Sequence, residues 1–312
     1  MPSIPDTACR ACGSKRAALA LEGIRDWEYG VEGEWSYRRC GDCGILQLEP
    51  FPSVAELIRA YSVDYHGYRT SAEKGKLYKL LFELKDALFR RKIARLVPRG
   101  AALLDVGCGS GEYLTRMRFL EPTRLDGIDF NERAVRLARE KGVDCFQGIF
   151  PDFPAAPSTY DVVFMNNYLE HTLDPAAEAR KACEVLKPGG VLIGEVPNFR
   201  SVDRALFGRY WGGNHVPRHT FQFEPATLKH LLRAAGFPLV RTKQELSTNH
   251  LTLSIQNALQ RNEPDLAKNP SIRYGRAWYY NPLLVALLPA NAVNVALGRS
   301  GVMKFFAERP AD

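Results

Sequence analysis

The segment from residue 101 to residue 114 constrains the fold of this chain more than any other. It reads AALLDVGCGSGEYL: a short apolar run, an aspartate, and glycines at three alternate positions, Gly107, Gly109 and Gly111. The run at 101–106 has the length and apolar density of a strand that is buried on both faces. Glycines directly after a strand let the backbone turn sharply and approach a ligand closely, because they lack Cβ. The pattern therefore predicts a ligand site at the carboxyl end of a parallel sheet.

The glycine spacing narrows the kind of nucleotide. A dinucleotide fingerprint, G-x-G-x-x-G, would need a third glycine where Glu112 stands, and a carboxylate there would repel a pyrophosphate. The chain contains no G-x-x-x-x-G-K-[ST] sequence, so a P-loop is excluded. A second apolar run at 125–130 contains Asp129, about 20 residues beyond the glycines, where a ribose-binding carboxylate is expected. These features disfavour NAD, FAD and P-loop nucleotides.

Strand and helix patterns alternate from residue 101 to about residue 246. Apolar runs at 160–167, 191–197 and 239–244 predict further strands, with helical patterns between them. This alternation predicts a doubly wound α/β fold with a parallel sheet.

The order of these motifs resembles that of the class I S-adenosylmethionine (SAM)-dependent methyltransferases. In that family an acid and a Gly-x-Gly-x-Gly turn follow the first strand, and a second acid ends the next strand. The resemblance implies SAM as the cofactor and a Rossmann-like sheet of seven strands, the last near 302–307 after a helical insertion. It also implies these cofactor-binding residues: Asp105, Gly107, Gly109, Gly111, Asp129, Phe130, Gln147, Asn166 and Tyr65.

Two of these expected contacts, the one to the adenine base and the one from Tyr65, are less directly marked by the motifs. Relatives often carry an acid after the third strand for the adenine amino group, whereas Ile149 stands here. Backbone groups or Gln147 are therefore expected to read the base. Tyr65 lies in a tyrosine-rich segment, which zinc-ribbon methyltransferases often pack over the cofactor pocket; a surface linker is the alternative.

Two Cys-x-x-Cys pairs, Cys9 with Cys12 and Cys40 with Cys43, lie near the N-terminus. Four thiolates at this spacing can close a tetrahedron around zinc. The sequence therefore predicts a zinc ribbon over residues 1–48 with a structural Zn²⁺ ion. Two disulfides are the alternative, which a reducing compartment disfavours.

The chain divides into three predicted regions. Residues 1–48 form the zinc ribbon, residues 49–99 form connecting helices and a cofactor lid, and residues 100–312 form the methyltransferase domain. Ser53 and Glu56 match a capping box at the start of a connecting helix.

Candidate catalytic groups follow the strand at 160–167. Glu170 and His171 are similar to the end of the Glu-x-x-Glu-His motif of the ubiquinone-biosynthesis O-methyltransferases, which has been linked to a divalent metal. Asn167 replaces the first acid of that motif, which puts metal binding in question. His171 could serve as a base, or the pair could cap a helix and orient the loop.

The segment at 209–223 carries two more histidines, His215 and His219, without a hydrophobic period. In this fold the loop walls the acceptor pocket, and loops of this kind often carry function. His219 is the first predicted proton acceptor, followed by His215.

The insertion at 247–299 contains no charge between Ala277 and Gly298. Its length suits a membrane span, but two prolines and three asparagines oppose insertion. Aromatic residues from Trp278 to Tyr280 next to Arg276 suit a membrane interface. Three alternatives stay open: an apolar lid or homodimer face, an interfacial membrane anchor, and a true span.

The expected reaction is methyl transfer from SAM to the oxygen of a small-molecule, lipid-linked or saccharide-linked acceptor, with a histidine base. The alternatives are a nucleotide-sugar C-methyltransferase, an RNA methyltransferase that uses the ribbon, and a non-catalytic SAM-binding scaffold. A net charge of +7 permits anionic partners and proves none. Nucleic acid is not the expected partner. No secretory signal pattern opens the chain, so a cytoplasmic location is expected, with peripheral contact at the inner membrane face through 277–298.

Overall fold

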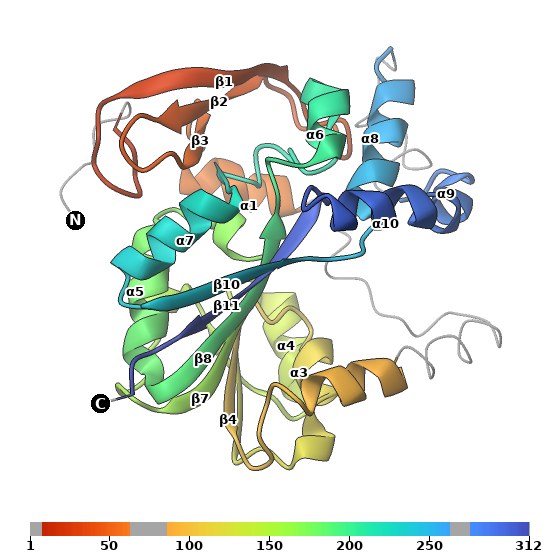
Figure 1. Cartoon of the computed structure of the whole chain (residues 1–312). Coiled ribbons are helices and arrows are strands. Elements are labelled where there is room, and N and C mark those ends of the chain that lie inside the picture. The colour runs from red at the N-terminus through yellow and green to blue at the C-terminus, as the bar shows by residue number, and fades with distance from the viewer. Residues whose placement is uncertain (1–7, 63–85, 263–274, 312) are drawn as a thin grey trace.

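A seven-stranded sheet forms the centre of the molecule (Figure 1). This computed structural model describes residues 8–62, 86–262 and 275–311. The strands lie in the order β10-β11-β8-β7-β4-β5-β6, and only β11 runs antiparallel to its neighbours. Their bounds are β4 Ala102–Val106, β5 Arg124–Asp129, β6 Asp144–Gln147, β7 Tyr160–Asn166, β8 Leu186–Pro197, β10 Leu239–Gln244 and β11 Val302–Glu308. The predicted seven-stranded Rossmann-like sheet is confirmed.

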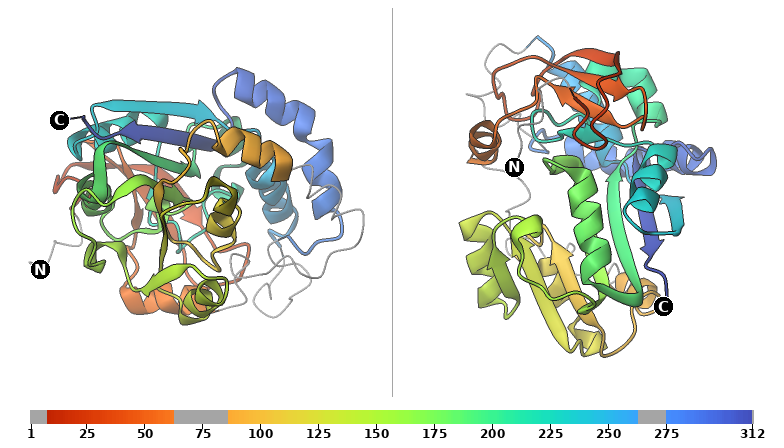
Figure 2. Two further views of the ribbon diagram at one scale, coloured as in Figure 1. Left: turned by 90° about the horizontal axis from the view of Figure 1, so that it is seen from below. Right: turned by 90° about the vertical axis from the view of Figure 1, so that its left-hand side faces the viewer.

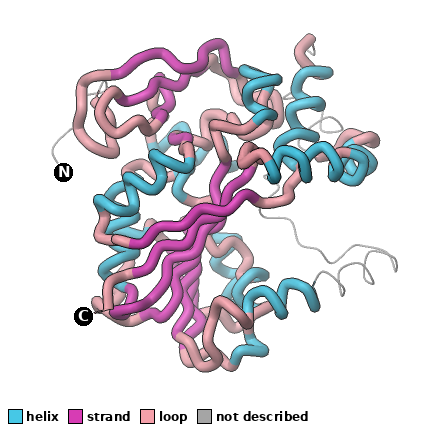
Figure 3. Tube along the Cα trace, viewed as in Figure 1, coloured by secondary structure: helices cyan, strands magenta, loops and turns pink. Residues whose placement is uncertain are grey.

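Helices cover both faces of this sheet (Figure 3). The helices are α1 Val54–Ser62, α3 Glu112–Thr115, α4 Glu132–Glu140, α5 Pro175–Val185, α6 Val202–Phe207, α7 Pro225–Ala234, α8 Asn249–Leu259, α9 Tyr280–Ala286 and α10 Leu288–Ala296. Short 3-10 helices lie at Arg118–Leu120, Phe150–Asp152, Leu169–His171 and Gly208–Tyr210. Leu104 of β4 packs in the cluster that contains α5 and α7, whereas Leu103 packs in the cluster that contains α4. Burial on both faces explains the uninterrupted apolar sequence of β4.

A second sheet lies over the carboxyl ends of the parallel strands (Figures 1 and 2). It contains β1 Ala17–Ile24, β2 Trp35–Cys40, β3 Leu46–Glu49 and the two-residue strand β9 Phe221–Gln222. β9 comes from the segment after β8, and it pairs with β3 through Leu46 and Gln47. The predicted ribbon at 1–48 therefore shares a sheet with residues far downstream.

The connecting and inserted helices complete the fold. Ser53 and Glu56 exchange the reciprocal hydrogen bonds of a capping box at the start of α1, as predicted. The insertion between β10 and β11 is helical and consists of α8, α9 and α10 in its described part. Among the described residues, no helix is both long enough and apolar enough to cross a membrane.

Candidate functional site

We call residues 8–62 the N-terminal unit. A cavity of about 860 Å³ lies between the carboxyl ends of the parallel strands and this unit. Residues at the ends of four strands line it: Gly107 after β4, Asp129 on β5, Gly148 after β6 and Asn166 on β7. Leu57 and Tyr61 of α1, and His250 and Leu253 of α8, also line it. Ligand sites commonly occupy about 300–1,000 Å³, so this cavity has room for a nucleoside cofactor and an acceptor.

The glycine turn is fixed by a carboxylate. The Asp129 carboxylate accepts a hydrogen bond from the Gly109 N–H at 2.9 Å and another from the Asn131 N–H at 2.8 Å. Gly107 has φ 76°, and a Cβ there would lie 2.8 Å from the Tyr168 ring, so only glycine fits without displacement. The turn therefore presents bare backbone to the cavity.

The structure divides the residues predicted to bind the cofactor into three groups. The residues that line the cavity are Gly107, Gly109, Asp129, Phe130 and Asn166. The residues outside the cavity lining are Asp105, Gly111 and Gln147. Tyr65 lies outside the described residues.

Each of the residues outside the lining has a physical reason for its place. Asp105 is buried behind the glycine turn. Gly111 packs against α4, where a Cβ would meet the Cβ of Ala138 at 3.2 Å. Gln147 is exposed, and its neighbours Gly148 and Ile149 line the cavity instead. This part of the cavity therefore offers an isoleucine side chain and backbone groups.

Two buried acids give this part of the site its electrostatic character. Burial and the charge of Asp129 raise the pKa of Asp105 to about 8. Burial also raises the pKa of Asp129, although hydrogen bonds from backbone N–H groups oppose this shift. A cationic ligand would reduce the repulsion between the carboxylates of Asp105 and Asp129, so the pair suits the positive charge of a sulfonium nucleoside.

Four histidines line the cavity: His250 and the three predicted candidates His171, His215 and His219. His171 lies on the 3-10 helix after β7, whereas His215 and His219 lie in the loop before β9. The ring centroids of His171 and His219 are 4.5 Å apart, and those of His215 and His219 are 4.9 Å apart. The structure therefore brings together all three histidines that the sequence singled out.

Each histidine has a different partner at Nδ1. The Nδ1 of His171 contacts the Tyr61 hydroxyl at 2.6 Å, and that of His219 contacts the carbonyl oxygen of Gly213 at 2.8 Å. The Nδ1 of His215 instead contacts a carboxylate oxygen of Glu28. Among the described residues, only His215 therefore contacts a carboxyl group at this nitrogen.

Glu28 and Asp26 lie in the connection between β1 and β2, and both are buried. Asp26 forms a buried ion pair with Arg218 at 3.0 Å. Two acids of the N-terminal unit therefore hold the loop that carries His215. Neither acid can be singled out from the sequence, because nothing local marks it as buried.

Burial sets the protonation of these groups. Desolvation lowers the pKa of His171 to about 3 and lowers that of His219 well below its ordinary value. Burial and the neighbouring Asp26 raise the pKa of Glu28 well above its usual range, and Arg218 opposes this shift. His215 also has φ 43°, a left-handed conformation that costs about 1–3 kcal/mol outside glycine and is concentrated at functional sites.

Glu170 lies behind the histidines and is fully buried. Within the described part of the chain, neither of its carboxylate oxygens has a hydrogen-bond partner. Ligand atoms of Glu170, His171 and His219 all lie within 4.8 Å of one another. One carboxylate and two imidazoles form a donor set that fits a divalent cation.

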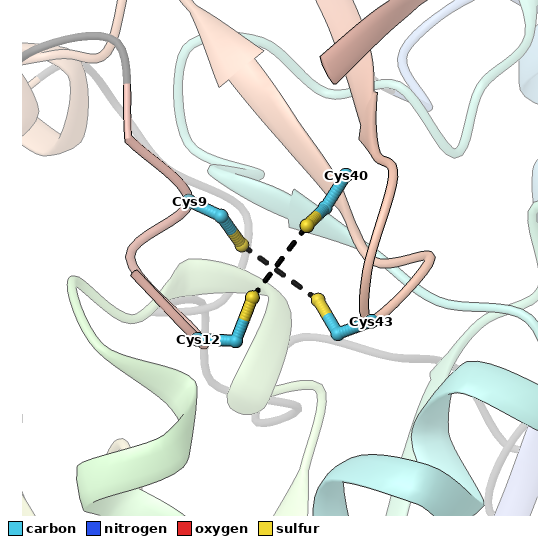
Figure 4. Close-up of side chains that lie close together, drawn as sticks. All are labelled: Cys9, Cys12, Cys40 and Cys43. Atoms are coloured by element: carbon cyan, nitrogen blue, oxygen red, sulfur yellow. Dashed lines mark hydrogen bonds between the residues drawn. The ribbon is translucent and has the colours of Figure 1, made fainter. Parts of the chain in front are cut away.

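The four N-terminal cysteines form a separate cluster (Figure 4). Their sulfur atoms all lie within 4.8 Å of one another, with Cys9 and Cys43 3.7 Å apart and Cys12 and Cys40 3.5 Å apart. Zinc–sulfur bonds of about 2.3 Å in a regular tetrahedron place the sulfurs about 3.8 Å apart. The cluster therefore has the dimensions of a four-thiolate zinc site.

Comparison with known proteins identifies the family. A family described as a methyltransferase domain matches residues 81–242. The chain belongs to the SAM-dependent methyltransferases. This methyltransferase is 32% identical over 172 residues to the ubiquinone biosynthesis O-methyltransferase of Thiobacillus denitrificans, an alignment that covers 51% of this chain and 74% of the relative. The corresponding enzyme of Cereibacter sphaeroides is 29% identical over 197 residues, which cover 54% of this chain and 80% of the relative.

A SAM-dependent methyltransferase from Archaeoglobus fulgidus superimposes with a TM-score of 0.48 and 21% sequence identity, covering 74% of the present methyltransferase and 100% of that chain.

Proposed function

We propose that this methyltransferase transfers the methyl group of SAM to a hydroxyl oxygen, with His215 as the general base. The acceptor is a small molecule or a lipid- or saccharide-linked hydroxyl compound. The observation that carries the proposal is the contact between the Nδ1 of His215 and the carboxylate of Glu28 at the cavity wall.

A carboxylate at Nδ1 suits a histidine for base catalysis. An oxygen of the Glu28 carboxyl group holds the proton on Nδ1, so Nε2 becomes the accepting nitrogen. An imidazolium that forms at His215 would favour the ionised form of Glu28, which burial opposes. Among the described residues, His219 contacts a neutral carbonyl oxygen at Nδ1 and no carboxyl group. The proposal therefore prefers His215 over His219, the first choice from sequence.

The residues around the glycine turn are assigned to the cofactor. Asp129 would hold the ribose hydroxyls, and Phe130 and Ile149 would flank the adenine. SAM, when bound, supplies a methyl group on a cationic sulfur that an in-line nucleophile displaces. The protein orients the acceptor hydroxyl and accepts its proton at Nε2 of His215, which together lower the barrier.

The acceptor class is argued from the cavity wall and from the relatives. Apolar side chains of the wall come from α1, α8 and β11 and include Leu57, Ile58, Leu253 and Val302. They favour an acceptor with a substantial apolar part. The relatives named above are O-methyltransferases, which supports oxygen as the receiving atom.

We also propose that Cys9, Cys12, Cys40 and Cys43 bind a structural zinc ion. All four ligands would come from the protein, which leaves no open position for catalysis. Metal binding would stabilise a unit that is too small to bury a large core of its own.

The test is product analysis with isotopically labelled SAM. The full-length enzyme is incubated with labelled SAM and an organic extract of cells, and the labelled product is identified by NMR and mass spectrometry. A methyl ether, formed by wild type and lost in His215→Gln, supports the proposal. A methyl ester, a methyl group on carbon or on nitrogen, or label in RNA, contradicts it. His230→Gln is the matched control, because His230 is exposed on α7 and does not line the cavity.

A further inference from the structure

Helix α10 has its polar and apolar faces reversed. Asn291 and Asn294, three residues apart, are buried, whereas Val293 and Leu297 are 57% and 63% exposed. Helices at the surface of a globular protein normally turn their apolar residues toward the core. Exposed apolar surface of this kind requires an explanation when it is contiguous.

The reversal is fixed by hydrogen bonds to the buried face. The Ser247 N–H donates to Oδ1 of Asn291 at 3.0 Å, and Nδ2 of Asn294 donates to Oδ1 of Asp203 at 3.2 Å. Rotation of the helix to bury its apolar side would break both bonds and leave buried polar groups without partners. The outward direction of the apolar side is therefore built into the fold.

Further exposed apolar residues precede α10. Val285 on α9, three residues before Leu288, is 68% exposed, and Trp278 just before α9 is 87% exposed. We call the exposed residues Trp278, Val285, Leu288, Val293 and Leu297 the insertion face. Figure 1 and the left view of Figure 2 place α9 and α10 at one side of the molecule.

The insertion face is flanked by cations. Arg276 precedes Trp278, and Arg299 follows Leu297; both arginines are exposed. Nε of Arg299 donates to the carbonyl oxygen of Arg200, so a third exposed arginine lies next to the same end of α10. Residues 275–307 contain no acidic residue.

We propose that the insertion face binds the surface of an anionic lipid bilayer. Its aliphatic side chains would enter the boundary between headgroups and acyl chains, Trp278 would lie at headgroup level, and the arginines would contact lipid phosphates. Attraction between these cations and an anionic leaflet would add to the contribution of the apolar side chains. A second copy of the chain is a poorer fit, because self-contact would bring the arginines of one copy close to those of the other.

Membrane binding would also serve the reaction. Helix α8 packs against α9 and carries His250 and Leu253, which line the cavity. A bilayer at the insertion face would therefore lie near the acceptor side of the cavity. This last point rests on the proposed lipid-linked acceptor, whereas the membrane binding itself does not.

The test is co-sedimentation of the full-length protein with vesicles, without SAM or acceptor. Wild type is expected to bind vesicles that contain phosphatidylglycerol and to bind phosphatidylcholine vesicles at least about tenfold more weakly. The double variant Val293→Ser, Leu297→Ser should lose about tenfold or more in affinity, because it removes apolar area that would leave water. Leu239→Ser is the matched control, because Leu239 is 61% exposed on β10, far along the chain from this face.

Two further measurements decide between the outcomes. Quenching of Trp278 fluorescence by brominated phosphatidylglycerol, compared with Trp278→Phe, reports insertion in otherwise unaltered protein. Equal binding by wild type and the double variant, or absence of Trp278 quenching, would overturn the proposal. So would a dimer in light scattering that the double variant abolishes, because a second copy would then cover the face. Methyl transfer is not measured in these assays, so failure of the proposed reaction would leave their result intact.

Discussion

Glu28 contacts the Nδ1 of His215 across 187 positions of the sequence. Glu28 belongs to the N-terminal unit, and His215 belongs to the loop that leads into β9. The Asp26–Arg218 ion pair ties the same connection to the same loop. The N-terminal unit therefore supports the wall of the cavity as well as a cysteine cluster.

Glu28→Gln is expected to lower kcat by about 10- to 100-fold, as loss of an orienting partner of a functional histidine typically does. His215→Gln should lower kcat further, by about 10²-fold or more, because it removes the base itself. Steady-state kinetics at saturating SAM measure both effects. An unchanged kcat in Glu28→Gln would contradict the role assigned to Glu28.

SAM affinity is expected to rise with pH up to about pH 8. The raised pKa of Asp105, about 8, keeps this carboxyl protonated at neutral pH, and a cationic ligand favours its ionised form. SAM binding should therefore release a proton, which calorimetry in two buffers of different ionisation enthalpy detects. Asp105→Asn should flatten the pH dependence. Binding without proton release at pH 7 would contradict this assignment.

The same groups predict the pH dependence of stability for the ligand-free protein. Burial raises the pKa of both Asp105 and Glu178 to about 8, so between about pH 4 and pH 8 the folded state binds more protons than the unfolded state. The contribution of these groups to the free energy of unfolding must then fall as pH rises through this range. Urea unfolding of wild type and Glu178→Gln at pH 5.5 and pH 8 measures it. The variant should lose less stability between these two pH values than wild type does, and an equal loss would refute the prediction.

Cys40→Ser is expected to remove one zinc ion per chain and to lower both the melting temperature and kcat. The loss of activity follows because the unit around the cluster also positions Glu28 and Asp26. Elemental analysis by mass spectrometry counts the metal, with Cys183→Ser as the control outside the cluster. Wild type that is fully active without metal would disprove the zinc assignment. A second metal that disappears in Glu170→Gln would show that the Glu170 group is filled.

Asp129→Asn should weaken SAM binding by about 10- to 100-fold, the expected cost of losing hydrogen bonds to a charged group. Calorimetry measures the affinity, and circular dichroism confirms the fold. Asp144→Asn is the control, because Asp144 is exposed on the neighbouring strand β6. Unchanged affinity would exclude Asp129 from the ribose position.

The sheet could be predicted because its strands show local apolar patterns in the sequence. β10 has the predicted bounds, Leu239–Gln244, and β4 differs from its apolar run by one residue. β8 differs more: it begins at Leu186, so the proline-glycine sequence at 187–190 lies within the strand and does not precede it. Gly189, with φ 74°, absorbs this irregularity.

Parts of the site could not be predicted from the sequence, because they depend on contacts between segments that are distant along the chain. Asp26 and Glu28 look like surface acids of a hairpin, and only their burial against the histidine loop gives them a role. The three histidines could be named individually, but their grouping follows from the pairing of β9 with β3. A two-residue strand has no periodicity by which it could be recognised.

The pairing between β3 and β9 limits which segments of this enzyme can be exchanged with those of a homologue. Leu46 and Gln47 are matched to Gln222 and Phe221, so each half of the ladder is complementary to its native counterpart. A chimaera that combines residues 8–62 of one parent protein with the methyltransferase domain of another would break this match. Recombination should therefore transfer residues 8–62 together with the segment 199–223 as one inherited block.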